Sequence, residues 1–153
     1  MIRPMVDSDL AFIYSSFIRS WLTGNLLSLC SSPAVQPMPM TTLWDDVLLP
    51  QVLSSCNTLV HEDSDVILGY TIFRPGLIFF TYTKELYRRS GVAAGLFEAS
   101  MGLLPPSKIT VVCSSRSGDK YLACMAKRNS CSFVKEPNLT YLGLIEKVEV
   151  LHG

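Results

Sequence analysis

The sequence predicts a mixed α/β (α+β) fold, and three observations predict it. Apolar residues recur with helical spacing near the N-terminus, and three strand-like runs joined by short turns follow. The rest of the chain then alternates between helical and strand-like segments. A chain of 153 residues has the usual length of one domain, and no linker or internal repeat interrupts it. We therefore expect residues 1–153 to form a single domain.

The first expected element is a helix that begins after Asp7 or Ser8, either of which can cap it. Its apolar residues are spaced at i, i+3, i+4, i+7, i+8 and i+11, so they share one helical face. These residues are Leu10, Ile13, Tyr14, Phe17, Ile18 and Trp21. Gly24 then supplies the stop that commonly follows a helix.

The next segment is expected to be irregular and then helical again. Residues 30–40 contain three prolines and several serines, which favours an exposed loop. A second short helix is expected from Thr42, carrying Trp44 on its apolar face. Pro50 is expected to end or kink that helix.

Three strand-like runs are expected to form an antiparallel meander. They span residues 57–62, 66–73 and 77–83, and all three are rich in β-branched, aromatic and other apolar residues. Residues 63–65 form a polar turn between the first two runs. Residues 74–76, Arg-Pro-Gly, have the proline and glycine that a type II turn favours at its centre. Because these turns are short, the strands that they join should be antiparallel neighbours.

Helical spacing returns after this meander. The third helix is expected to carry Val92, Leu96, Ala99 and Leu103 and to end at Pro105-Pro106. A buried strand over residues 109–113 follows. Another helix is expected after Ser117 or Asp119, with Tyr121, Leu122, Met125 and Ala126 along it. A strand near residues 132–134 and a last one within 144–150 complete the order.

The composition excludes several classes of protein. Hydrophobic residues make up 48% and charged residues 17% of the chain, which excludes a disordered protein. Thirteen basic residues balance thirteen acidic ones, so a nucleic-acid partner is not expected. The mean hydropathy is +0.30, but no apolar run approaches the roughly 20 residues of a spanning helix. The N-terminus lacks a secretory pattern, and we expect a cytoplasmic protein without a membrane partner.

The cysteines do not indicate a disulfide framework or a metal site. There are five, an odd number, and no two are spaced as CxxC. Zinc sites and disulfide scaffolds favour closer, paired spacing. We expect reduced, mostly buried thiols and no bound metal. They are Cys30, Cys56, Cys113, Cys124 and Cys131.

The most informative segment for function joins the third strand-like run to the third helix. It reads TKELYRRSGVAAG from Thr83 to Gly95. A helix that starts there directs free N–H groups and the positive end of its dipole at an anion. Small residues at 91 and 93 allow close approach to the backbone, and two arginines at 88–89 add positive charge. This pattern predicts a diphosphate site, and the alternative is that the small residues only let the helix pack tightly on the sheet.

Arg88, Gly91 and Ala93 give the segment its resemblance to a known family. They match the Gln/Arg-x-x-Gly-x-Gly/Ala signature of the GNAT superfamily of acetyl-CoA-dependent N-acetyltransferases. The order of elements from residue 2 to residue 135 is similar to that family, including the opening Ile-Arg-Pro and the pair Gly69-Tyr70. The resemblance implies a GNAT-like, mostly antiparallel central sheet with helices on both faces.

The same resemblance implies a cofactor, acetyl-CoA or CoA, and residues that bind it. Pantetheine would lie between two splayed strands, the one ending near Thr83 and the one starting at Ile109. Backbone groups of Phe80, Tyr82 and Thr83 would pair with it as an added strand does. The implied cofactor-binding residues are Phe80, Tyr82, Thr83, Arg88, Arg89, Ser90, Gly91, Val92 and Ala93.

The sequence departs from the family at the expected catalytic acid and base. Residues 77–83 contain no carboxylate, and residues 125–131 contain no tyrosine. Substitute candidates are His61 as a proton relay, its neighbour Glu62, and Tyr121. The alternative for His61 and Glu62 is that they are solvated residues next to a turn.

Two functions follow from this reading. The first is an acetyl-CoA-binding GNAT-like protein that transfers an acetyl group to an amine of a small molecule or a protein. The second is a catalytically weak or inactive GNAT-fold interaction protein, of the kind that bacteriophages encode. Such a protein would bind and modulate a bacterial host enzyme in the host cytoplasm. Either a monomer or a homodimer is compatible with the sequence.

Overall fold

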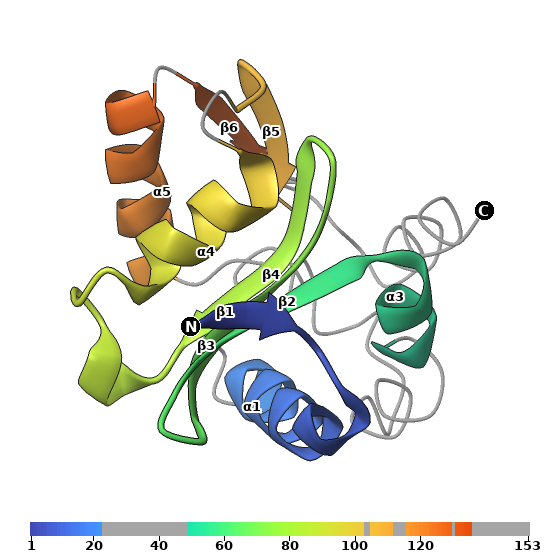
Figure 1. The fold of residues 1–153 in the computed structure, drawn as a ribbon. Helices are drawn as coiled ribbons and strands as arrows, with labels where there is room; N and C mark the ends of the chain where they lie inside the picture. The colour runs from blue at the N-terminus through green and yellow to red at the C-terminus, as the bar shows by residue number, and fades with distance from the viewer. Residues whose placement is uncertain (23–48, 103–104, 112–115, 130, 136–153) are drawn as a thin grey trace.

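The computed structural model describes residues 1–22, 49–102, 105–111, 116–129 and 131–135. They form one six-stranded sheet with helices on both faces (Figure 1). The strands are β1 (Ile2–Pro4), β2 (Asn57–Asp63), β3 (Val66–Arg74), β4 (Leu77–Thr83), β5 (Lys108–Val111) and β6 (Ser132–Lys135). The helices are α1 (Leu10–Leu22), α3 (Leu49–Ser55), α4 (Val92–Met101) and α5 (Arg116–Asn129), with 3-10 turns η1 (Asp7–Asp9) and η5 (Glu85–Tyr87).

The strands lie in the sheet in their order along the chain, from β1 to β6. The pairs from β1 to β4 are antiparallel, whereas β4–β5 and β5–β6 are parallel. Tight turns close the predicted meander: Ser64 and Asp65 have φ of 51° and 65°, and Gly76 has φ of 74°. Parallel neighbours need a crossover connection, and α4 and α5 supply the two crossovers. The predicted mixed, mostly antiparallel sheet is confirmed.

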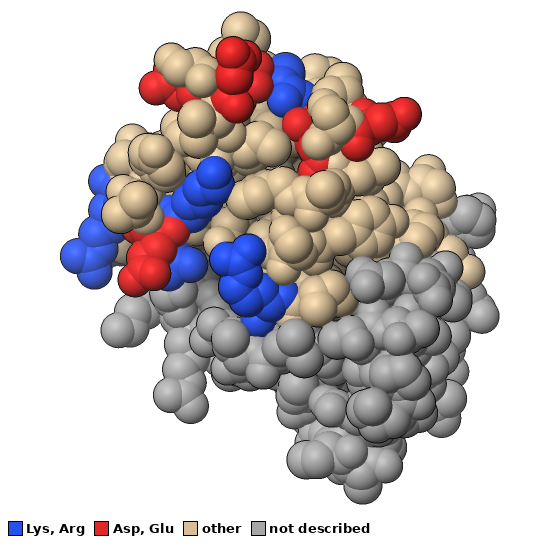
Figure 2. Space-filling view, turned by 90° about the horizontal axis from the view of Figure 1, so that it is seen from below, with Lys and Arg blue, Asp and Glu red and all other residues tan. Residues whose placement is uncertain are grey.

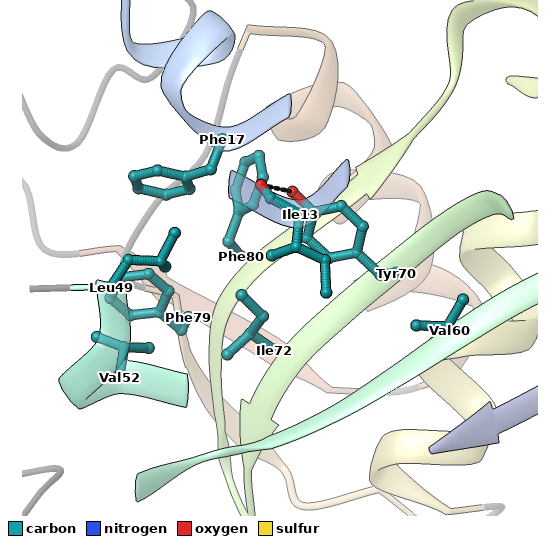
Figure 3. Close-up of a cluster of buried hydrophobic side chains, with 9 residues drawn as sticks. All are labelled: Ile13, Phe17, Leu49, Val52, Val60, Tyr70, Ile72, Phe79 and Phe80. Atoms are coloured by element: carbon teal, nitrogen blue, oxygen red, sulfur yellow. Dashed lines mark hydrogen bonds between the residues drawn. The ribbon is translucent and has the colours of Figure 1, made fainter. Parts of the chain in front are cut away.

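One face of the sheet is covered by α1 and α3 (Figure 1). Apolar side chains from both helices meet those of the central strands in what we call the α1-side core (Figure 3). The Tyr70 hydroxyl lies inside this core, 2.7 Å from Ser16 Oγ and 3.3 Å from the Ile13 carbonyl oxygen. The buried members are Ile13, Phe17, Leu49, Val52, Val60, Tyr70, Ile72, Phe79 and Phe80.

The other face is covered by α4 and α5 (Figure 1). One buried cluster here joins β3, β4 and β5 to both helices, and a smaller one joins β3 to the start of α4. The larger cluster contains Phe73, Ile78, Phe97, Met101, Ile109 and Met125, and the smaller one Leu68, Val92 and Leu96.

A β-bulge in β4 separates its first residues from its last. The register of β3 and β4 passes from Ile72–Phe80 to Phe73–Ile78, so Phe79 is an extra residue in β4. As a result, the consecutive residues Phe79 and Phe80 both enter the α1-side core. The parallel strand β5 pairs with β4 only at Leu77 and Ile78, before the bulge. Beyond it, residues 79–83 have no strand partner on that side within the described part of the chain.

The starts of the helices differ from several sequence predictions. Asp9, not Asp7 or Ser8, accepts the hydrogen bond at the start of the first helical segment, from the Val6 N–H at 2.8 Å. Pro50 lies within α3, whose helical residues continue to Ser55, so it does not end that helix.

The end of α4 and the start of α5 also differ from the sequence predictions. Helix α4 stops at Gly102, whose φ of 84° suits only glycine well, and therefore before Pro105. Helix α5 begins at Arg116, so Ser117 and Asp119 lie within the helix and do not cap it. The predictions for Gly24, Thr42 and Trp44, and those for residues 30–40 and 144–150, fall outside the described residues.

Two sequence predictions concern the chain as a whole. No helix among the described residues is long and apolar enough to span a membrane. The described cysteines Cys56, Cys124 and Cys131 are unpaired. The expectation of mostly buried thiols is wrong for these three, because Cys56 and Cys131 are half-buried and Cys124 is exposed.

Candidate functional site

Among the described residues, the end of β4 has no strand partner on the side away from β3, and we call this side its free edge. The strand pairing shows which backbone groups are directed at it. The Lys84 N–H donates to the Leu68 carbonyl oxygen at 2.9 Å, next to the Gly69–Thr83 pair. In an antiparallel ladder this makes Gly69–Thr83 a non-hydrogen-bonded pair. The backbone groups of the preceding residue, Tyr82, are therefore directed at its partner Tyr70 in β3.

The same alternation corrects which residues can bind a ligand along this edge. The backbone groups of Phe80, like those of Tyr82, are directed at β3 and serve the sheet. Those of Thr81 and Thr83 are directed at the free edge. The expectation that Phe80 and Tyr82 offer their backbone to pantetheine is therefore wrong for these two residues. For Thr83 it stays a prediction, and its carbonyl oxygen already accepts a hydrogen bond from Arg88 Nε.

The connection from β4 to α4 contains two residues in the left-handed region. Arg89 has φ of 66°, and Gly91, immediately before α4, has φ of 89°. Among the described residues, and leaving aside Gly91 and its two chain neighbours, no heavy atom lies within 4 Å of the place where a Cβ on Gly91 would be. Glycine is therefore favoured at 91 by its backbone conformation, and the space beside it is open.

The first turn of α4 presents backbone amides without an acceptor. Val92, Ala93 and Ala94 are its first three residues, and an α-helix contains no acceptor for the amides at these positions. The first amide with a partner is that of Gly95, which donates to the Gly91 carbonyl oxygen at 2.9 Å. No other backbone carbonyl of the described residues accepts from the first three amides. They are available to an anion.

The polar side chains of the connection make contacts with several different parts of the chain. Arg88 Nε donates to the Thr83 carbonyl oxygen at 3.1 Å, which ties the loop to the end of β4. Arg88 and Arg89 are both exposed. The Ser90 hydroxyl donates to the Tyr87 carbonyl oxygen within the turn. Lys84 is directed elsewhere, with its ammonium 4.9 Å from the centre of the Phe12 ring on α1.

The charge around the connection is mainly positive. Lys84, Arg88 and Arg89 outnumber Glu85, the one acidic residue between Thr83 and Gly95. Figure 2 shows Lys and Arg side chains gathered at the left of the face seen from below, the side on which this connection lies in Figure 1. This charge favours an anionic ligand.

Among the three predicted catalytic residues, Glu62 is held in an ion pair. Its carboxylate lies 3.0 Å from Arg3 Nε and 3.1 Å from Arg3 Nη2, while Arg3 also binds Asp9 at 2.7 Å. The hydrogen bond from Arg3 lowers the pKa of Glu62. A carboxylate with a lowered pKa is a weaker base, so Glu62 serves to join β1 to β2.

His61 lies on β2, between Ile2 of β1 and Gly69 of β3. Its imidazole faces α4, with Cδ2 3.9 Å from the position of a Cβ on Gly95. Nδ1 is buried and has no hydrogen-bond partner among the described residues. Burial, followed by the charge of the N-terminal amine, lowers the pKa of His61, and Asp63 opposes this in part. The side chain is therefore neutral at pH 7.

Tyr121 lies on α5 and packs against the larger cluster on the α4 face. Its hydroxyl is buried without a hydrogen-bond partner among the described residues. Burial raises the pKa of Tyr121, so the hydroxyl keeps its proton at neutral pH. No hydrogen bond among the described residues joins Tyr121 to His61 or Glu62, so these three do not form a linked set.

Two features near the site were missed by the sequence analysis. Thr71 and Thr81 face each other across β3 and β4, with their hydroxyl oxygens 2.8 Å apart. Gly69 contacts both β4 and α4. Counting residues from the turn at 74–76 could have suggested the threonine pair, but only with knowledge of the bulge at Phe79.

Comparisons with known proteins complete the description. No family model matches the chain, and no curated protein matches it. One similar solved structure, from Rhodopseudomonas palustris, is described as a GCN5-related N-acetyltransferase, "Aminotransferase, Class-II". It is 22% identical with a TM-score of 0.46, and the match covers 65% of this chain and 61% of that one, less than two thirds of its length. Another is an acetyltransferase from Vibrio fischeri, 17% identical with a TM-score of 0.37, covering 89% of this chain and 94% of that one. Neither likeness identifies a substrate or a site residue here.

Proposed function

We propose that the chain binds acetyl-CoA at the β4–α4 connection and transfers the acetyl group to an amine. The observation that carries this proposal is the start of α4. Three amides follow Gly91 without a backbone acceptor among the described residues, no other described heavy atom lies within 4 Å of a Cβ placed at 91, and Arg88 belongs to the same connection. A diphosphate accepts hydrogen bonds from such amides and is attracted by the helix dipole.

The contacts of Gly91 weigh against the alternative that the small residues only serve packing. Apart from its chain neighbours, a Cβ at 91 would meet no heavy atom of the described residues within 4 Å, so glycine is not needed there for α4 to approach the described sheet. Glycine at this position instead sets the direction of the chain and leaves the amides uncovered. An anion could therefore approach the backbone here without a steric obstacle from residue 91.

The free edge of β4 is where the amide-containing part of acetyl-CoA is proposed to bind. Thr81 directs its N–H and carbonyl oxygen away from β3, and Thr83 its N–H, while the Thr83 carbonyl oxygen accepts from Arg88 Nε. An extended amide-containing group can pair with such an edge. When bound, acetyl-CoA would supply an activated acyl group as a thioester. The chain would contribute anchoring of the diphosphate by residues 88–94 and alignment along residues 81–83. Holding the two reactants together is itself a large part of catalysis.

His61 is the proposed proton acceptor for the amine. Glu62 is engaged by Arg3, and the raised pKa of Tyr121 keeps its proton in place. His61 is neutral at pH 7 and can accept a proton, although its Nδ1 is buried next to α4. We keep His61 as the proposed relay and expect positioning to contribute more to the rate than acid–base catalysis.

The experiment that tests this function compares charge reversal inside and outside the site. Titration calorimetry with CoA and acetyl-CoA should show binding by the wild type. Arg88→Glu should weaken binding by about tenfold or more, because a charge-assisted contact becomes a repulsion. Lys108→Glu, the same change at an exposed position on β5, should leave the affinity within about twofold. Absence of wild-type binding at millimolar CoA would end the proposal.

A second function, an interaction protein of GNAT-like fold, is favoured by Leu86. This leucine is 91% exposed in η5, between Lys84 and the two arginines. A large apolar side chain so exposed among cations suits contact with an acidic protein surface, such as a host enzyme if the chain is phage-encoded. Pull-down with wild type and Leu86→Ser from a bacterial lysate tests it, and a partner retained equally by both would count against this surface.

A further inference from the structure

Gly69 lies where β3, β4 and α4 meet. It is opposite Thr83, the last residue of β4. A Cβ at Gly69 would lie 2.5 Å from the Tyr82 carbonyl oxygen, 3.2 Å from Thr83 Cα and 3.1 Å from Val92 Cγ1. The first distance is shorter than real Cβ contacts allow, so no side chain fits here without movement of its neighbours.

The reason for glycine at 69 differs from the reason at 91. Gly69 is not among the residues with positive φ, so its backbone conformation is open to any amino acid. What excludes a side chain is contact with other elements. Gly91 shows the reverse, with a left-handed backbone and open space.

The atoms that a Cβ at Gly69 would meet belong to the two elements that the β4–α4 connection joins. Thr83 ends β4, and Val92 begins α4. Val92 is 4% exposed and packs with Leu68 and Leu96, so its side chain has little freedom to turn aside. A Cβ at Gly69 must therefore displace the end of β4, the start of α4, or both.

We infer that Gly69 is a positioning residue for the proposed acetyl-CoA site: the absence of its side chain holds the amides at the start of α4 beside the free edge of β4. The inference rests on the proposed function, because it concerns one ligand that contacts both ends of the connection. Such a ligand is sensitive to a relative shift of well under 1 Å, since its contacts on the two sides must be made together.

The test replaces Gly69 with alanine and measures CoA affinity by calorimetry and Tm by thermal unfolding. Gly69→Ala should bind CoA about tenfold more weakly than wild type, a loss of about 1.4 kcal/mol. Gly95→Ala is the matched control, because a Cβ there meets Ile2 Cδ1 at 3.4 Å and His61 Cδ2 at 3.9 Å, which are ordinary contacts. Val52→Ala, in the core on the opposite face, controls for lower Tm alone. Both controls should bind CoA within about twofold of wild type.

Two further variants approach the same contact from the helix. Val92→Ile lengthens the side chain that lies against Gly69 without altering the β3–β4 ladder, and it should also weaken CoA binding. Val92→Ala, added to Gly69→Ala, removes the Cγ1 that the new Cβ meets and should restore part of the affinity. Recovery of this kind would not follow from general destabilisation. If Gly69→Ala does not fold, Val92→Ile decides the question.

The outcomes separate this inference from the proposed function. Wild type that binds no CoA overturns both. Wild type that binds, with Gly69→Ala and Val92→Ile unchanged in affinity, overturns the inference alone. The inference is also overturned if Val52→Ala loses as much CoA affinity as Gly69→Ala at the same Tm, because the loss would then come from lower stability.

Discussion

Alanine at Gly91 and at Gly76 should cost the same stability but differ in their effect on binding. Both glycines have left-handed backbones, with φ of 89° and 74°. Within the part of the chain that the structure describes, neither Cβ position has a heavy atom within 4 Å other than those of its chain neighbours. An L-residue in this region costs about 1–2 kcal/mol, and no steric clash adds to it. For a chain of this length, each kcal/mol corresponds to a Tm change of about 2–4 °C. Each variant should therefore melt a few degrees below wild type.

The two variants should then separate in a CoA titration. A methyl group at 91 enters the space in front of the amides of α4, where the diphosphate is proposed to lie. Gly91→Ala should bind CoA about tenfold more weakly, a loss of about 1.4 kcal/mol, whereas Gly76→Ala should bind as wild type does. Equal affinities in the two variants would refute the assignment of the loop. A much larger Tm loss in Gly91→Ala than in Gly76→Ala would refute the claim that residue 91 has no packing role.

Three further predictions concern stability. Burial lowers the pKa of His61 in the folded state, so below pH 6.5 the unfolded chain binds more protons than the folded one. The free energy of unfolding should therefore fall as the pH is lowered through this range. Chemical denaturation of His61→Gln should show a correspondingly smaller dependence on pH. Asp9→Asn should lower the free energy of unfolding by about 1–3 kcal/mol at pH 7, because it breaks the ion pair with Arg3. In acid the substitution should cost less, because the Asp9 carboxylate of the wild type is then protonated as well. Tyr70→Phe should lower the free energy of unfolding in urea by about 1 kcal/mol, because it removes the hydrogen bonds of the hydroxyl with Ser16 and Ile13. CoA affinity should be unchanged, because these partners lie on the α1 side of the sheet. A tenfold weaker affinity would contradict this separation of the core from the site.

Local signals predicted most elements because their causes are local. The apolar stripe of α1 and the extended runs of the meander are properties of neighbouring residues. Gly76 takes the left-handed φ that a type II turn requires, as predicted. Helix ends were less predictable: Pro50 lies within α3 and does not end it, and Gly102 ends α4 before the prolines that were expected to do so.

The sequence by itself predicted the three meander strands, the left-handed glycine of the turn at 74–76 and the helix start after Gly91, because each depends on a few adjacent residues. Only the tertiary structure decided which N–H and carbonyl groups of β4 are directed away from β3. The bulge at Phe79 and the pairing of Gly69 with Thr83 set that choice, and a strand's partner and register depend on residues distant in the chain. The need for glycine at 69 has the same origin: the atoms that exclude a side chain belong to β4 and α4, and they approach Gly69 only when the sheet and helix have packed.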